Sequence, residues 1–304
     1  MAGLVAVGLD GSGESRAAAD WAAREAVRRG LPLRLVHAWE WPPRGVAGLA
    51  ADETAAGWGR RMLDDAQARL HERHPELDVE TRQISDAPVE VLLRAAVRAE
   101  LLVLGSRGAS GFAGFLVGSV GLATVARASC PVVLVRAGPE RSGRHAGGDG
   151  RGSAVPGLDV GRPSAVADQG AVVVGLDVGR PCDELIAFAF DAAARRSASL
   201  LALNVWQPPL PFAHPRSSLP ARDEAERALL AVLRPWHEKF PEIRLTAQVV
   251  SGNAAARLLS ATSGAALLAV GRRRHRPPLG TRLGAVAHAV IHHAVCPVAV
   301  IPHN

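Results

Sequence analysis

The stretch Val5-Ala6-Val7-Gly8-Leu9-Asp10 near the start of the chain returns as Val172-Val173-Val174-Gly175-Leu176-Asp177 in its second half. Each copy is a short apolar run that ends in an acidic residue. Other segments repeat about 167 residues further along the chain: Trp39, His71–Glu76 and Cys130–Val135 return as Trp206, His237–Glu242 and Cys296–Ile301. This offset is too long for a solenoid repeat and indicates two complete tandem domains.

Composition marks the boundary between the two copies. Residues 138–169 are rich in Gly, Arg, Ser, Pro and Asp and show no apolar periodicity, which is typical of a flexible linker. We therefore expect a first domain at residues 1–137 and a second domain at residues 170–304. Domains of this length can bury a core without a disulfide or a structural metal.

Each copy alternates strand-like and helix-like segments. In the first copy the strand-like segments are Leu4–Gly8, Leu33–Ala38, Leu77–Ile84, Leu101–Leu104 and Val132–Val135, and the helix-like ones are residues 15–29, 52–73, 88–100 and 119–129. The order predicts the α/β class, with two tandem doubly wound domains, each a five-stranded, mostly parallel sheet flanked by helices. The alternating pattern of residues 77–84 predicts an edge strand. Such sheets bind ligands at the carboxyl ends of strands, where the strand order reverses.

Composition and charge exclude several classes of protein. The chain has 304 residues, of which 48% are hydrophobic and 21% charged, so wholesale disorder is excluded. The net charge of +6 favours anionic ligands without selecting one. Three cysteines without CxxC spacing predict neither a disulfide framework nor a zinc site. The apolar runs are too short to cross a bilayer, and the sequence starts without a basic leader, so we expect a cytoplasmic protein without a membrane partner.

A glycine-rich motif follows the fourth strand-like segment. Gly105-Ser106-Arg107-Gly108 is separated by nine residues from Gly118-Ser119, which opens a helix-like segment. Glycines let the backbone approach a phosphate, and the unpaired N–H groups of a helix N-terminus favour an anion. The Ser119 hydroxyl is expected to cap the helix and to contact a phosphate as well. No Gly-Lys-Ser/Thr follows, so the motif is not the common P-loop.

On these residues the chain resembles a tandem universal stress protein, a family with an adenine nucleotide alpha hydrolase-like fold. The resemblance covers both halves apart from the linker, and Gly105, Gly108, Gly118 and Ser119 match the family's nucleotide motif at every position. The resemblance implies that ATP, AMP or ADP binds with its phosphates at these residues, either alone or together with Mg²⁺. The other residues that we expect around the nucleotide are Asp10 beside the adenine and ribose, Val36 and His37 at the adenine, and Arg107 and Val120 near the motif.

The second copy departs from the motif. It reads Gly271-Arg272-Arg273-Arg274, nine residues, then Gly284-Ala285, while Asp177 matches Asp10. Arg274 replaces a glycine and is expected to occupy the phosphate space, and Ala285 lacks the serine hydroxyl. We expect a weak or empty second site formed by Asp177, Gly271, Arg274 and Gly284. The alternative is that the arginines replace backbone contacts by charge.

Other signals have simpler interpretations. The basic run Arg272–Arg276 lies in a ligand loop without interleaved aromatics, so we interpret it as a solvated loop and expect no nucleic-acid partner. His288 and His292 have a spacing that can bind metal, but histidines on a helix surface are common and we expect no metal site. Cys130 and Cys296 precede prolines, where small buried residues are expected.

These observations predict a nucleotide-responsive stress or regulatory protein rather than a fast enzyme, with slow ATP hydrolysis as a secondary property at most. No catalytic residue is assigned. The resemblance also implies that the two domains pair through their last strands, with a homodimer as a further option. Two alternatives stay open. One is an interaction scaffold that binds no nucleotide, and the other is an ATP-dependent enzyme of the related nucleotide-hydrolase class.

Overall fold

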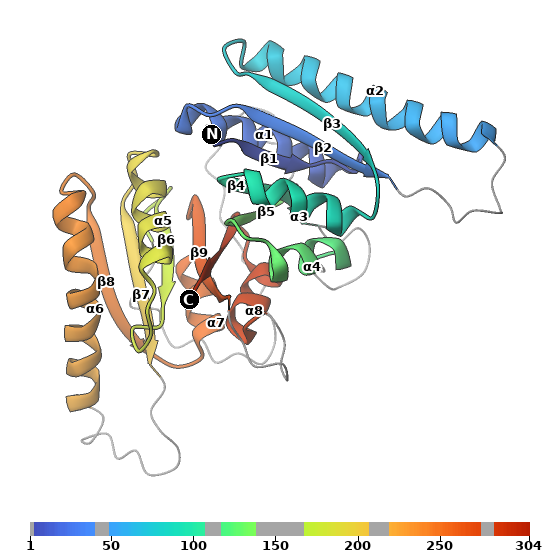
Figure 1. Cartoon of the computed structure of the whole chain (residues 1–304). Coiled ribbons are helices and arrows are strands. Elements are labelled where there is room, and N and C mark those ends of the chain that lie inside the picture. Colours follow the sequence, from blue (N-terminus) through green and yellow to red (C-terminus); the bar gives the residue numbers. More distant parts are fainter. Residues whose placement is uncertain (1–2, 40–48, 107–116, 138–166, 207–218, 275–282) are drawn as a thin grey trace, which may run out of the picture.

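A computed structural model describes residues 3–39, 49–106, 117–137, 167–206, 219–274 and 283–304 (Figure 1). The first half alternates strands and helices in the expected order. Its elements are β1 (Val5–Gly8), α1 (Gly13–Arg29), β2 (Leu33–Trp39), α2 (Leu49–Arg73), β3 (Val79–Ser85), α3 (Pro88–Arg98), β4 (Leu101–Ser106), α4 (Ser119–Arg127) and β5 (Val132–Arg136).

The second half repeats this order. Its elements are β6 (Val172–Leu176), α5 (Asp183–Ala194), β7 (Leu200–Trp206), α6 (Leu219–Lys239), β8 (Leu245–Ser251), α7 (Ala254–Ala261), β9 (Leu267–Arg273), α8 (Ala285–His293) and β10 (Val298–His303). The residues expected to form the linker lie mostly outside the described residues.

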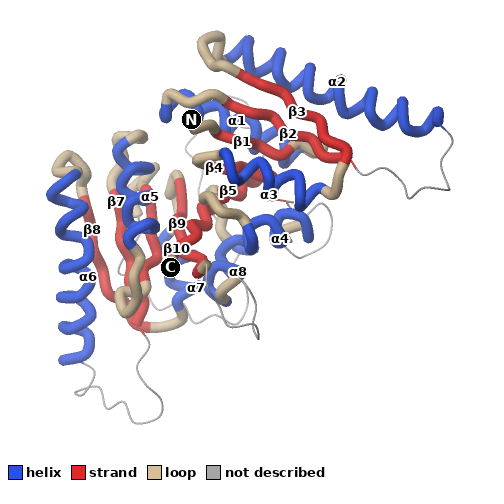
Figure 2. Tube along the Cα trace, viewed as in Figure 1, coloured by secondary structure: helices blue, strands red, loops and turns tan. Residues whose placement is uncertain are grey.

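The described strands form one sheet in the order β3-β2-β1-β4-β5-β10-β9-β6-β7-β8 (Figure 2). Pairing within each half is parallel, as predicted, and β3 lies at an edge. The halves join where β5 pairs antiparallel with β10, with Val133 opposite Ala299. The pairing of the domains through their last strands is therefore intramolecular.

Helices cover both faces of this sheet, as the nearly continuous apolar strands require. On one face α1, α2, α5 and α6 bury a core that includes Trp21, Leu63, Phe190 and Leu233. On the other face α3, α4, α7 and α8 bury a second core, which includes Leu92. The doubly wound α/β architecture predicted from the sequence is thus the architecture of the protein.

Local sequence signals explain where several elements begin and end. Ser12 caps α1 by accepting the Ser15 N–H, and Gly30 ends this helix in the left-handed conformation, with φ of 62°. Pro88 stands in the first turn of α3, where its missing N–H costs nothing.

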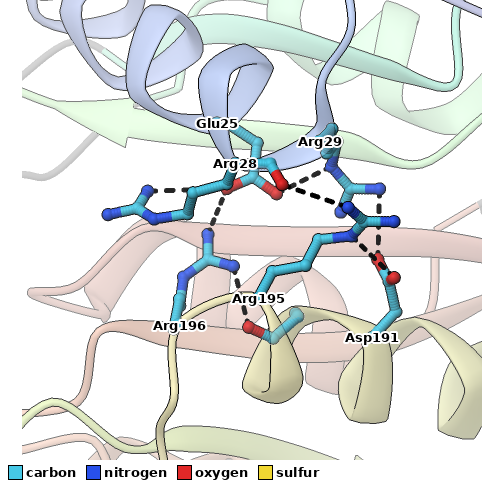
Figure 3. Close-up of polar contacts among 7 residues, drawn as sticks. Glu25, Arg28, Arg29, Asp191, Arg195 and Arg196 are labelled. Carbon is cyan, nitrogen blue, oxygen red and sulfur yellow. Dashed lines mark hydrogen bonds and ion pairs between the residues drawn. The ribbon is translucent and has the colours of Figure 1, made fainter.

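A buried cluster of charges joins α1 to α5 across the seam between the domains (Figure 3). The Glu25 side chain is 1% exposed, and its carboxylate lies 2.8 Å from Nε of Arg29 and 2.6 Å from Nη2 of Arg196 in the second domain. Arg29 also lies 3.2 Å from the Asp191 carboxylate. The Arg196 guanidinium lies over the Trp21 ring, 5.7 Å from its centroid. Charge pairing and cation–π contact therefore fix how the two domains meet on this face.

We expect Glu25→Ala to lower the free energy of unfolding by about 3–5 kcal/mol, because it leaves buried guanidinium groups without their carboxylate. Urea unfolding of the full chain followed by circular dichroism measures the change. Glu238→Ala is the matched control, since Glu238 pairs with Arg234 at an exposed site and such pairs contribute little. Equal losses in the two variants would contradict the role assigned to the cluster.

Cys130 and Cys296 are buried, as expected, and Cys182 is buried as well. All three are free thiols. Burial raises the pKa of Cys130 to about 12. The same cause raises the pKa of Cys182 and of Cys296 to about 11. In the described part of the chain, no helix combines the length and apolar character needed to cross a membrane.

We expect the native protein to react slowly with a disulfide reagent at pH 8. A raised pKa keeps each thiol protonated, and only the thiolate is the nucleophile. Absorbance measurements with Ellman's reagent should show three fast-reacting thiols after unfolding in guanidinium chloride, and a slow native reaction that accelerates as the pH approaches 11. A fast native reaction of Cys130 or Cys296 at pH 8 would show that these thiols are exposed.

Candidate nucleotide site

A cavity of about 250 Å³ opens at the carboxyl ends of β1 and β4. The chain passes from β1 to β2 on one side and from β4 to β5 on the other, so this is the point where the strand order reverses. Its lining comes from the ends of these strands, from β2 and from the first turns of α1, α3 and α4: Gly8, Leu9, Asp10, Ser12, Glu14, Ser15, Val36, Ala38, Pro88, Leu92, Leu104, Gly105, Gly118, Ser119, Val120 and Gly121.

A local hydrogen-bond network shapes the turn between β1 and α1. The Asp10 carboxylate accepts the Ser12 N–H at 3.0 Å and the Ser12 hydroxyl at 2.5 Å. The Ser12 hydroxyl oxygen in turn accepts the Ser15 N–H at 3.1 Å. These contacts hold the acidic side chain at the cavity rim, where Asp10 is exposed.

Gly105 is required by close packing as well as by the cavity. A Cβ atom at this position would lie 2.6 Å from the Glu14 carbonyl carbon and 2.7 Å from the Ser15 nitrogen. These are backbone atoms of the first turn of α1 and cannot move aside easily. The end of β4 therefore packs directly beneath the start of α1, and this brings two of the expected site elements together.

The start of α4 lies on the opposite wall of the cavity. Gly118 is the N-cap of α4, with φ of −61° and ψ of 157°, and no side chain caps the helix. The prediction that the Ser119 hydroxyl caps α4 is wrong, because Ser119 is the first residue inside the helix. Its side chain is exposed beside the first-turn N–H groups, which have no partner within the helix.

His37 is the one described site residue of the first domain that lies away from the cavity lining. Its Nδ1 atom lies 2.8 Å from the Leu9 carbonyl oxygen, which can only accept, so Nδ1 carries the proton. The buried ring also packs edge-on against Trp58 of α2, with the centroids 5.7 Å apart. His37 thus supports the backbone that carries Asp10. Val36 and Ala38, its neighbours on β2, line the cavity.

The structure therefore gathers most of the predicted residues in one place. Arg107 and Gly108 lie outside the described residues. The charged residues among those that line this cavity are both acidic, Asp10 and Glu14, so the described lining supplies no cationic side chain for a phosphate.

The second domain has a larger cavity, of about 660 Å³, at the equivalent place. Asp177, Gly271 and Gly284 line it as expected, and the Asp177 carboxylate lies 3.2 Å from Nε of Arg180. Arg274 does not belong to the described lining. Its side chain is exposed, and its N–H donates to the His303 carbonyl at 2.8 Å. Arg274 therefore does not occupy the space that was expected for it.

Two signals that the sequence analysis set aside lie at the domain interface. Arg272 is 6% exposed, not solvated, and its Nη2 donates to the Ala128 carbonyl of the first domain. His292 is buried, not on the helix surface, and its Nδ1 accepts the Val117 N–H at 3.4 Å. The interpretations are therefore wrong for Arg272 and His292, because each contact spans more than a hundred residues of sequence. Arg274 of the same run and His288 of the same pair are exposed, as expected. Among the described residues no group of His, Cys, Asp or Glu side chains could hold a metal ion.

Comparisons with known proteins agree with this architecture. The model of the Universal stress protein family matches residues 1–136 and 170–302. Universal stress protein Rv2005c of Mycobacterium tuberculosis is 32% identical over 311 residues, covering 97% of this chain and 96% of that protein. Rv2623 of the same organism is also 32% identical, covering 97% of this chain and 95% of its own.

Solved structures support the fold over the whole length. A universal stress protein from Archaeoglobus fulgidus superposes with a TM-score of 0.61 at 16% identity, covering 99% of this chain and 98% of that chain. A putative universal stress protein from Pseudomonas aeruginosa gives the same TM-score at 15% identity, covering 99% and 93% of the two chains. Given the family match in both halves and relatives aligned over nearly their full length, this chain belongs to the universal stress protein family.

Proposed function

We propose that the first domain binds ATP or a related adenine nucleotide in the cavity between β1 and β4. The observation that carries this proposal is the convergence of an apolar wall, an acidic rim residue and the uncapped start of α4 on one cavity. Small-molecule sites combine apolar walls with a few placed polar groups in this way. We propose further that nucleotide occupancy is the signal of a stress or regulatory protein.

The apolar wall suits the base. Val36, Ala38 and Leu104 line one side of the cavity with hydrocarbon, against which a planar adenine ring buries its faces. Asp10 stands at the rim, where a carboxylate accepts hydrogen bonds from ribose hydroxyls. The Ser12 contacts hold this carboxylate before any ligand arrives, and preorganisation of this kind favours affinity.

The start of α4 suits the phosphates. The first-turn N–H groups after Gly118 have no acceptors in the helix, and the helix dipole adds partial positive charge there. The Ser119 hydroxyl supplies one more donor. The acidic residues Asp10 and Glu14 line the same cavity and repel a triphosphate. This charge balance fits a nucleotide bound together with Mg²⁺, which phosphate oxygens and waters hold and which would neutralise part of the charge.

The second domain is proposed as the weaker site. Asp177 is already paired with Arg180, and Ala285 lacks the hydroxyl that Ser119 supplies. The arginines that line the second cavity still favour an anion there: Arg180, Arg272 and Arg273. The alternative therefore stays open that their charges replace the backbone contacts which the motif provides in the first domain.

Gly118→Arg should weaken ATP binding at least tenfold, about 1.4 kcal/mol, because the new side chain enters the space beside the α4 amides. The backbone at position 118 is accessible to any residue, so we expect the variant to fold. Isothermal titration calorimetry on nucleotide-free protein measures the dissociation constant.

The matched control is Gly284→Arg, which changes the equivalent N-cap glycine in nearly the same conformation, with φ of −67° and ψ of 152°. It should leave the main dissociation constant unchanged. Loss of binding in Gly284→Arg alone would place the main site in the second domain, and wild-type protein without saturable binding would favour the scaffold alternative.

We expect Mg²⁺ removal to weaken ATP binding severalfold and to leave AMP binding almost unchanged. The carboxylates of Asp10 and Glu14 repel the triphosphate more strongly than the monophosphate, since repulsion scales with the product of the charges. Titrations of each nucleotide in Mg²⁺ and in EDTA measure the difference. Equal effects on the two nucleotides would contradict a charge-balancing role for the cation.

A further inference from the structure

Both ends of α4 are held by the other domain. Just before the helix, the Val117 N–H donates to Nδ1 of His292, which belongs to α8. Just after the helix, the Ala128 carbonyl accepts a hydrogen bond from Nη2 of Arg272, which belongs to β9. Between these two contacts lie Gly118 and Ser119, which line the first cavity. The second domain therefore contacts the candidate phosphate-binding helix at its start and at its end.

The end of α8 is held by the first domain in a similar way. Arg136 of β5 donates through Nη2 to the carbonyls of Ile291 and His292 at the end of α8. In the sheet, Arg136 pairs with Ser106, whereas Arg272 pairs with Pro302. Each domain thus extends one arginine to the terminal carbonyls of the other domain's helix, from the fifth strand in the first domain and from the fourth strand in the second. A cation at a helix C-terminus is stabilising, so each domain holds the other's helix.

A short helix needs such support. The nine residues of α4 form too short a helix to be stable alone in water, so its position depends on tertiary contacts. N–H groups bind a phosphate well only if their directions are fixed before the ligand arrives. Any loosening of α4 would therefore lower the affinity of the site for a nucleotide.

We propose that Arg272 and His292 are positioning residues for the first domain's nucleotide site, so that the second domain sets the affinity of the first by holding α4 at both ends. This inference rests on the proposed function for its effect on affinity, while the positioning of α4 is independent of it. It also assigns a role to one residue each of the arginine run and the histidine pair, neither of which belongs to the lining of the first cavity.

The test compares variants that remove the contacts with variants that retain them. Arg272→Met and His292→Leu remove the donor and the acceptor at similar volume. Arg272→Lys keeps the charge, and His292→Asn keeps an acceptor near the place of Nδ1. The matched control is Arg196→Met, which breaks a different cross-domain contact, to Glu25, on the sheet face opposite α4.

Two measurements are made on each full-length variant. Hydrogen–deuterium exchange of residues 119–127 without nucleotide reports whether α4 is held, and calorimetry reports the dissociation constant for ATP. We expect Arg272→Met and His292→Leu to speed exchange in α4 and to raise the dissociation constant about three- to tenfold. Arg272→Lys and His292→Asn should recover part of both effects. Arg196→Met should lower the melting temperature and leave both readouts of α4 near wild type.

The outcomes separate the two proposals. Unchanged α4 exchange in Arg272→Met and His292→Leu overturns the positioning role, as does an equal change in Arg196→Met, which would indicate general loosening of the interface. Faster exchange with an unchanged dissociation constant overturns the effect on affinity. Wild-type protein that binds no nucleotide overturns the proposed function, and the exchange data then decide the positioning role alone. If Arg272→Met fails to fold, Arg272→Lys and His292→Asn carry the same comparison.

Discussion

The antiparallel pairing of β5 with β10 is the constraint on which the other contacts between the domains depend. Val133 and Ala299 face each other at the centre of the pairing, and both are fully buried. Without this contact each domain would expose an apolar strand edge, which is a template for aggregation. The pairing covers both of these edges and joins the two domains into one continuous sheet. It also fixes which helices become neighbours across the seam.

The two faces of the seam are closed by different chemistry. On one face the buried Glu25 carboxylate meets Arg29 and Arg196 (Figure 3). On the other face, arginines donate to backbone carbonyls at the ends of α4 and α8. Burying charge costs desolvation free energy, which a complete set of partners offsets. Such contacts tolerate little displacement, so they select one orientation of the domains where apolar packing alone would allow several.

The sequence predicts what depends on neighbouring residues. The strand-like runs are local signals, and the structure confirms them. The left-handed cap at Gly30 and the proline at the start of α3 are local features of the same kind. Repetition of the whole pattern predicts the tandem architecture. The motif glycines also predict which strand ends meet at the cavity, because parallel strands place their carboxyl ends at one edge.

Contacts between distant segments were beyond this kind of reasoning. His37 lies next to Val36 in sequence, but adjacent residues of a strand point to opposite faces, so only one of them lines the cavity. From the sequence alone Arg272 is interpreted as a loop arginine, because only the antiparallel pairing of the two domains brings Ala128 close to it. Ser119 has the residue type of an N-cap, but Gly118, whose backbone is extended, takes that position.

The position of Arg272 also bears on whether the two cavities are independent. Its side chain belongs to the lining of the second cavity and donates to the carbonyl that ends α4, whose first turn lines the first cavity. An anion that enters the second cavity therefore meets a guanidinium already engaged by the other domain. If the anion draws that group toward itself, α4 loses part of its support, and each ligand then lowers the affinity of the protein for the other by the same factor, as linkage requires. Arg272 occupies a position that the nucleotide motif leaves free, next to Gly271, and from there it links the second cavity to the helix that lines the first.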